Sequence, residues 1–279
     1  MLFYLAAGFV FLLSNLNKWM FTSFACCAGL CMFLNQQSAS PFPTSSNDVL
    51  GIKVAHFNLE QSTDDLDVSF QIIKGINADL VSIHSMNDES KCSLDSQFLK
   101  KYPYYKILPS NQKNGYCMGV FSKLPISYID TFQSEHTPHI IGCIDWMEKD
   151  FCFINLRSAG NDKTDYLALQ RHFLEVSKKV SLVSSPILTW GEFDAVPWSS
   201  EFSTLCKNGN LAVSDQGPKP SLPNGMVNIF SPQMHHILYS PEFTCTDFRT
   251  ISGPHSPQFG ILGSYQLNNP RHELSQVIR

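Results

Sequence analysis

The chain has 279 residues, of which 43% are hydrophobic and only 16% are charged. This length suits one globular domain of about 230 residues together with a separate apolar segment. The formal net charge of −4 argues against nucleic acid and anionic lipid headgroups as partners, because both attract clustered Lys and Arg.

Two apolar runs open the chain, at residues 2–13 and 21–34, and Lys18 between them is the only charge before Asp48. Neither run alone reaches the roughly 20 residues that a spanning helix needs. Three interpretations stay open: a hairpin or pair of short membrane helices, a single long signal anchor, and a cleaved signal peptide. The missing basic n-region disfavours the last of these. We therefore expect a membrane anchor over residues 1–35.

Residues 36–47 are rich in Ser, Pro and Gln and predict a tether between the anchor and the domain. If the anchor is a hairpin, Lys18 marks its turn as the cytoplasmic end. The domain then lies on the periplasmic or exoplasmic side, as at a bacterial inner membrane. The membrane itself, and a membrane-protein complex within it, are the partners that this arrangement predicts.

The remaining chain alternates strand and helix patterns. Gly51–Leu59 predicts a strand that ends in polar residues, and Asp64–Asn77 predicts an amphipathic helix. Thr164–Val183 predicts a second long helix, and Ser199 or Ser200 can cap a short third one. Further strands are expected at Asp79–His84, Tyr104–Leu108, Cys117–Ser122, Ser127–Phe132, Ile140–Trp146, Phe151–Asn155, Ile187–Trp190, His236–Tyr239 and Gly260–Leu267.

Six cysteines fall in this part of the chain without any Cys-x-x-Cys spacing, which excludes a recognisable zinc ribbon or thioredoxin motif. Cys143 and Cys152 lie in apolar runs and predict buried thiols. An exported domain permits disulfides, but the spacing does not say which cysteines would pair.

The segment Ser185–Ser199 carries the strongest functional signal. Its apolar residues run into Gly-Glu-Phe-Asp, so that Glu192 and Asp194 follow a buried strand, before Pro197 and Trp198 turn the chain away. The carboxyl ends of strands are where α/β folds build their sites. The pattern predicts a cluster of carboxylates at a sheet edge.

Six parts of the chain, in this order, resemble motifs of the endonuclease/exonuclease/phosphatase superfamily. They are Val54–Asn58, Ala78–Ser85, Tyr102–Tyr105 with Gly119–Ile126, Trp190–Ser199, Gln233–Ser240 and Gly253–Pro257. The resemblance, strongest to membrane-anchored bacterial members, implies a four-layered α/β/β/α sandwich of two mixed sheets over residues 48–268, with 269–279 as a polar tail. It also implies phosphoester hydrolysis with Mg²⁺, where carboxylates hold the ion and a His paired with an Asp positions the attack.

Several positions that carry this chemistry in the family differ here. Ser85 stands where the family has its metal-binding Glu, and a neutral hydroxyl cannot replace a carboxylate in holding Mg²⁺. Asp88 and Glu89 could substitute only if their loop bends back. Arg157 replaces a His and keeps donors for a phosphate without exchanging protons near neutral pH. Asn58 matches the family residue.

The later motifs change in the same direction. Glu192 and Asp194 stand for an Asp and an Asn, which lengthens one carboxylate and adds a charge that repels phosphate. His236 keeps an imidazole in register without the acid before it. His255 survives, but Pro254 replaces the acid that would orient it, which weakens it as a general base.

Two function classes stay open. The first is a degenerate domain that serves as a binding or assembly subunit, with no cofactor. The second is a phosphodiesterase or phosphatase with a rearranged site, in which Glu192 and Asp194 hold Mg²⁺ or Mn²⁺; a phosphoester ligand suits both. The candidate site residues are Asn58, Arg157, Glu192, Asp194, His236 and His255. A Zn²⁺ or Mn²⁺ site formed by His235, His236, His255, Glu192 and Asp194 is a further option.

Overall fold

The computed structural model describes residues 2–36, 51–59, 65–87, 94, 96–109, 117–146, 149–157, 166–214, 234–254, 256 and 258–268. The predicted tether from residue 37 onward, the C-terminal tail, and the candidate residues Asp88, Glu89 and His255 lie outside these ranges. The described residues divide between an N-terminal pair of helices and an α+β domain.

The N-terminal unit is a helical hairpin of α1 (Leu2–Leu13) and α2 (Asn17–Gln36), not one continuous helix. Asn15, in the connecting turn, has a left-handed φ of 57°. The helices approach closely at Gly8, where a side chain would meet the ring of Phe24. Within the described residues, none of the helices combines the length and the apolar character required to cross a membrane.

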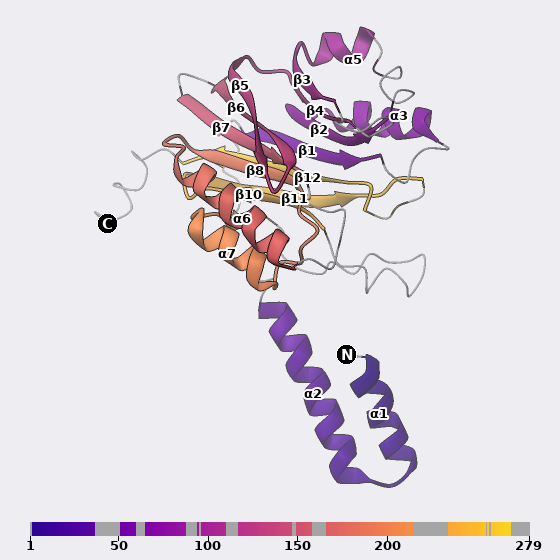
Figure 1. The fold of residues 1–279 in the computed structure, drawn as a ribbon. Helices are drawn as coiled ribbons and strands as arrows, with labels where there is room; N and C mark the ends of the chain where they lie inside the picture. The colour runs from indigo at the N-terminus through magenta and orange to yellow at the C-terminus, as the bar shows by residue number, and fades with distance from the viewer. Residues whose placement is uncertain are drawn as a thin grey trace, which may run out of the picture. The chain divides into compact units, whose positions relative to one another are not determined.

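Two six-stranded mixed sheets form the second unit (Figure 1). The first has the order β11-β12-β1-β2-β4-β3 with β1 and β2 parallel, and the second has the order β5-β6-β7-β8-β10-β9 with β7 and β8 parallel. The strands are β1 (Ile52–Asn58), β2 (Leu80–Met86), β3 (Tyr104–Leu108), β4 (Cys117–Ser122), β5 (Ile126–Ser134), β6 (Thr137–Trp146), β7 (Lys149–Leu156), β8 (Ile187–Glu192), β9 (Ala212–Val213), β10 (His235–Tyr239), β11 (Phe243–Ile251) and β12 (Gly260–Leu267).

Helices cover the outer faces of the sheets (Figure 1). The helices α3 (Leu66–Ile76) and α5 (Ser96–Lys101) pack on the first sheet, and α6 (Tyr166–Ser181) and α7 (Ser200–Asn208) pack on the second. A third apolar cluster, which includes Val54, Phe153 and Trp190, fills the space between the sheets. The predicted α+β sandwich of two mixed sheets is confirmed.

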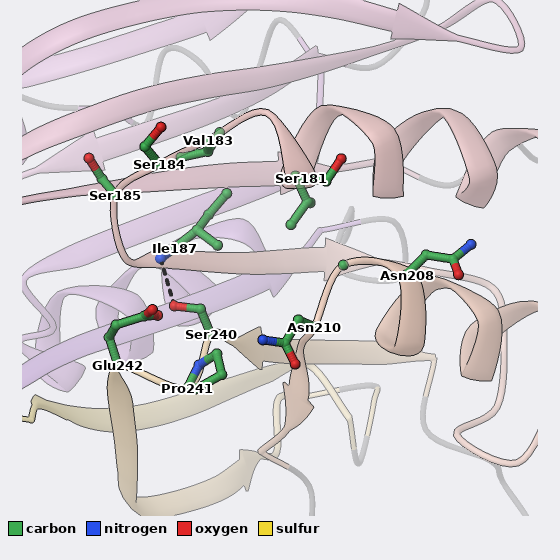
Figure 2. A pocket seen from close by; sticks show the side chains of 12 residues that line it. Ser181, Val183, Ser184, Ser185, Ile187, Asn208, Asn210, Ser240, Pro241 and Glu242 are labelled. Carbon is green, nitrogen blue, oxygen red and sulfur yellow. Dashed lines mark hydrogen bonds between the residues drawn. The ribbon is translucent and has the colours of Figure 1, made fainter.

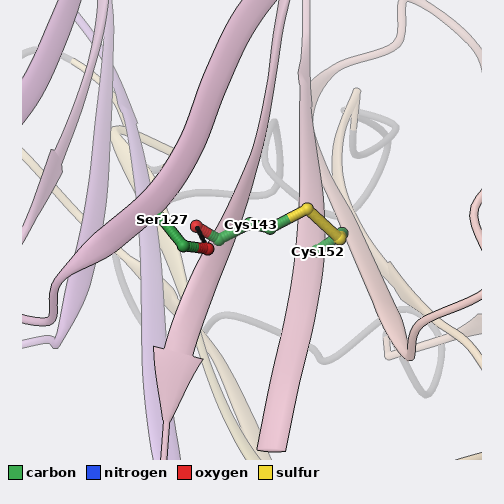
Figure 3. The surroundings of a disulfide bond; sticks show 3 residues. All are labelled: Ser127, Cys143 and Cys152. Atoms are coloured by element: carbon green, nitrogen blue, oxygen red, sulfur yellow. Dashed lines mark hydrogen bonds between the residues drawn. A yellow bond between two sulfur atoms is a disulfide. The ribbon is translucent and has the colours of Figure 1, made fainter.

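The two buried thiols predicted at Cys143 and Cys152 form a disulfide instead (Figure 3). The antiparallel register of β6 and β7 places the two residues directly opposite each other, with 3.9 Å between their Cα atoms. The Ser127 hydroxyl donates to the Cys143 carbonyl oxygen at 3.2 Å. The prediction of free thiols is wrong because pairing depends on register, which the spacing along the chain does not reveal.

Candidate functional site

Three candidate residues, Asn58, Arg157 and Glu192, lie together with His235 where strands of both sheets end. Asn58 closes β1, Glu192 closes β8, and the parallel pairing of β7 with β8 places Arg157 just beyond the same edge. His235 opens β10 directly opposite Glu192. The Asn58 amide donates to Glu192 Oε1 at 3.4 Å, so the two sheets meet at this edge. The side chains of these four residues are half-buried.

The backbone has unusual conformations at the end of β8 and in β2 near the site. Gly191 has a φ of 140°, and a Cβ there would overlap the carbonyl group of Leu156, so only glycine fits. Asp194 follows with a left-handed φ of 49°. In β2, a bulge lies between Ile83 and Met86, and Ser85 within it has a φ of 58°. Strain of this kind is typical of functional sites in such folds.

Beneath these residues, a buried hydrogen-bond network crosses from one sheet to the other. The Trp190 indole N–H donates to Ser82 Oγ at 2.8 Å, and the same oxygen lies 2.8 Å from His56 Nδ1. His56 Nε2 lies 2.9 Å from His235 Nδ1. The network therefore runs from β8 to β2 and β1 and returns to β10 at the site.

A second buried pair runs beside the first. Asn155 donates its amide N–H to the Trp190 carbonyl at 3.1 Å, which leaves its Oδ1 to accept from His84 Nε2 at 2.9 Å. The His84 proton is therefore on Nε2, and Nδ1 carries a lone pair. That nitrogen is buried and has no hydrogen-bond partner.

Burial keeps these imidazoles neutral. Desolvation lowers the pKa of His84 from 6.5 to about 3, against the opposing effect of the Asn155 hydrogen bond. Desolvation also lowers the pKa of His56 well below 6.5, helped by the nearby His84 and His235. The pKa of His235 falls to about 4 through burial, opposed by the charge of Asp194. At pH 7 the site therefore contains neutral rings.

Of the two adjacent histidines, the structure brings His235 to the site and not the candidate His236. His236 lies on the opposite face of β10, fully buried, with its ring packed on those of Phe193 and Phe202. Its Nε2 bonds the Ala195 carbonyl at 3.0 Å. The reason is the alternation of side chains along a strand, which turns neighbours to opposite faces.

Arg157 links the site to a second histidine cluster beneath α6. Its backbone N–H donates to His139 Nδ1 at 3.2 Å, and His139 Nε2 lies 3.0 Å from Ser134 Oγ. Ser134 Oγ lies 2.6 Å from Nδ1 of His172 on α6. Desolvation lowers the pKa of His172 to about 4. This cluster holds the β5–β6 turn against the helix.

A hollow of about 200 Å³ opens at the other end of β8 and β10 (Figure 2). Serine and asparagine side chains and Glu242 line it, and the Ile187 N–H donates to Ser240 Oγ at 3.0 Å. It contains none of the candidate residues.

No protein-family model matches the chain, and no curated protein matches it either. Solved structures do. An endonuclease/exonuclease/phosphatase family protein from Bacteroides thetaiotaomicron aligns with a TM-score of 0.63 at 16% identity, over 80% of this chain and 100% of that chain. The human nocturnin catalytic domain, with a bound sulfate, aligns with a TM-score of 0.60 at 12% identity, over 82% and 100%. The chain has the fold of the endonuclease/exonuclease/phosphatase superfamily.

A mannosyl-6-phosphatase from Bacteroides thetaiotaomicron has this superfamily fold too, with a TM-score of 0.58 at 15% identity over 78% of this chain and 100% of that chain. The resemblance inferred from the six motifs is confirmed at the level of the fold. At these identities the likeness carries no residue roles with it.

The superfamily implies a divalent cation, and the described residues do not fit one of the Mg²⁺ type. Mg²⁺ takes carboxylate and other oxygen ligands, but Ser85 brings a hydroxyl and the neighbouring imidazoles are bonded to one another. The Asn58 amide donates to the Glu192 carboxylate at 3.4 Å. Within the ranges that the structure describes, no three His, Cys, Asp or Glu side chains are grouped so as to hold a metal ion.

The residues that sequence reasoning missed are those of the network, namely His56, Ser82, His84 and Asn155. A signal for them exists. Polar residues stand at alternate positions of otherwise apolar strands, as in Val54-x-His56 and Leu80-x-Ser82, which places them on the face between the sheets. These faces come together only because the two sheets pack against each other, however, and the sequence of one strand does not show this.

Proposed function

We propose that the domain uses the superfamily sandwich as a binding or assembly subunit and has lost metal-dependent hydrolysis. The observation that carries this proposal is the network at the strand edge, where His56 bonds His235 and His84 bonds Asn155. In these contacts His56 Nε2 and His235 Nδ1 bond each other, His84 Nε2 bonds the Asn155 side-chain oxygen, and burial keeps the rings neutral. Such an edge is a stable polar contact between two sheets, not a set of oxygen ligands for Mg²⁺.

A phosphoester or a similar oxyanion is the ligand class that we propose. Sulfate binds the nocturnin domain, and a mannosyl-6-phosphatase shares the fold. In this chain, Arg157 supplies a guanidinium group beside the site: burial lowers the pKa values of His84 and His139, and the charge of Arg157 lowers them further. A guanidinium group binds phosphate oxygens in a bidentate manner without proton transfer.

The test is an assay on the full-length chain in detergent, with bis-para-nitrophenyl phosphate and para-nitrophenyl phosphate in the presence of Mg²⁺ or Mn²⁺. We expect the wild type to release no more nitrophenol than its Glu192→Gln variant. Metal-dependent turnover that is lost in Glu192→Gln and in Asp194→Asn would overturn the proposal and establish the hydrolase. The same preparations test binding, because a non-hydrolysed ligand should raise the melting temperature in the wild type and not in Arg157→Gln.

The N-terminal hairpin supports a second part of the proposal, which is attachment to a membrane. Most of its exposed side chains are apolar: Leu13 is 88% exposed and Phe21 69% exposed, and Phe3, Phe9, Val10 and Trp19 are more than half exposed. Apolar surface of this extent is unfavourable in water and favourable in a bilayer. The periplasmic or exoplasmic placement of the domain stays a prediction.

Flotation with vesicles of phosphatidylcholine and phosphatidylglycerol tests this attachment. We expect the wild type to float and the double variant Leu13→Asp, Phe21→Asp to stay in the dense fraction. Leu182→Asp is the matched control, because Leu182 is 78% exposed but belongs to the domain. Equal flotation of all three proteins would refute attachment through the hairpin, and sedimentation of the wild type would refute membrane attachment altogether.

A further inference from the structure

The direction of each hydrogen bond in the buried network follows from which atoms carry protons. An indole nitrogen only donates, so Trp190 donates to Ser82 Oγ. The Ser82 hydroxyl has one proton of its own, and it is fully buried. Within the described part of the chain, the one acceptor that the structure places within reach of it is His56 Nδ1, at 2.8 Å.

The next two bonds follow from the first two. A neutral imidazole carries one proton. If His56 Nδ1 accepts from Ser82, the His56 proton is on Nε2, which then donates to His235 Nδ1 at 2.9 Å. His235 Nδ1 is thereby an acceptor, and the proton of the neutral His235 ring is on Nε2.

The reverse direction is less favourable. If His235 donated to His56, then His56 Nδ1–H would donate to Ser82, and the Ser82 proton would face only the donor N–H of Trp190. A buried hydroxyl without an acceptor costs about 1–3 kcal/mol. That cost corresponds to roughly a fivefold to 150-fold preference for the direction that starts at Trp190.

We propose that Trp190, Ser82 and His56 act as positioning residues that hold His235 in the Nε2–H tautomer, so that His235 acts at the site as a hydrogen-bond donor. In this state both lone-pair functions of the ring are lost: Nδ1 is occupied by His56, and Nε2 is protonated. His235 can then serve neither as a general base nor as a nitrogen ligand for a metal. An Nε2–H group can only donate, and a phosphoryl oxygen is the class of acceptor that suits it. This assignment of ligand chemistry rests on the binding role proposed above.

Nitrogen NMR of histidine tautomers tests this assignment directly. The full-length chain is labelled with ¹⁵N-histidine, and long-range proton–nitrogen correlations are recorded at pH 7, with His235→Gln and His56→Gln used for assignment. We expect a protonated Nε2 and an unprotonated Nδ1 in both rings. A protonated Nδ1 on His235, or equal populations of the two tautomers, would overturn the proposal.

Two variants test the origin of the tautomer. Ser82→Ala removes the hydroxyl that donates to His56, so we expect loss of the pure Nε2–H pattern in both rings, and Ser82→Thr should restore it. The matched control is Ser134→Ala, which removes a hydroxyl from the other histidine cluster and should leave the His235 signals unchanged. An unchanged tautomer pattern in Ser82→Ala would refute the proposed series of hydrogen bonds from Trp190 to His235.

The turnover assay on the same preparations separates this inference from the proposed function. Metal-dependent hydrolysis by a protein whose His235 is the Nε2–H tautomer would overturn the proposed function and leave the tautomer assignment standing. Absence of turnover together with an Nδ1–H tautomer would overturn the tautomer assignment and leave the proposed function standing.

Discussion

Acidification should destabilise this domain steeply, because it contains neutral buried histidines. Burial lowers the pKa of His84 from 6.5 to about 3 and that of His172 to about 4. Each side chain is only 1% exposed. In the unfolded chain both rings regain their ordinary pKa, so below pH 6.5 the unfolded state binds more protons than the native state. Stability is therefore lost as the pH falls from about 6.5 towards the native values.

The magnitude follows from linkage. Consider a histidine with a pKa of 6.5 in the unfolded chain and of 4 or lower in the native state. As the pH falls from 7.5 to 5, this histidine lowers the free energy of unfolding by about 2 kcal/mol. His84 and His172 together withdraw about 4 kcal/mol, and His56 and His139, whose pKa values also lie well below 6.5, act in the same direction. Because domains are stable by only about 5–15 kcal/mol, the fold should fail near pH 5.

Urea unfolding of the full-length chain, followed by circular dichroism at several pH values, measures this loss. His172→Gln should reduce the slope of the free energy of unfolding against pH near pH 5 by about 1.3 kcal/mol per pH unit. That is the contribution of one proton taken up on unfolding. His136→Asn, at an exposed position of the β5–β6 turn, is the matched control for the removal of one imidazole. A total loss below about 4 kcal/mol over this range would contradict the reasoning, since it would mean that fewer than two rings are held neutral.

Three further changes probe the fold around the site. Gly191→Ala should cost about 3 kcal/mol or more, because its Cβ meets the Leu156 carbonyl; a soluble variant with wild-type stability in urea would contradict this. Replacing Cys143 and Cys152 together by alanine removes a disulfide that closes a loop with a sequence separation of 9. This should lower the free energy of unfolding by about 2–3 kcal/mol. In reductant, where the wild type has no disulfide either, the difference between the two proteins should disappear. Ser199→Ala removes the cap of α7 and should cost about 1 kcal/mol by thermal unfolding, whereas Ser199→Asp should not.

The strands were predicted best where apolar runs are bounded by clear breaks. Tyr104–Leu108, Cys117–Ser122 and Gly260–Leu267 have the bounds that the sequence indicates. The strand Phe243–Ile251 was missed, because a bulge between Cys245 and Asp247 interrupts the alternation that would have marked it. Local pattern therefore predicts a strand only where its pairing is regular.

The site was predicted less well than the fold, for a reason that the two adjacent histidines illustrate. The motif favoured His236 as the functional ring, but pairing with β8 places His235 opposite Glu192 and turns His236 towards α7. Which neighbour faces the partner sheet depends on register. Register is a property of two paired strands and cannot be inferred from the sequence of one strand alone. The same holds for the pairing of Cys143 with Cys152.

The side chains at the strand edge are best understood as a set of contacts between the two sheets. Carboxylates facing one another across two sheets repel unless a cation lies between them. Here Glu192 faces the Asn58 amide, and His235 faces His56, so each contact between the sheets is attractive without an ion. In the direction proposed above, the contact with His56 occupies the Nδ1 lone pair of His235, so an interaction that joins the two sheets at this edge would also oppose a role for His235 as a general base.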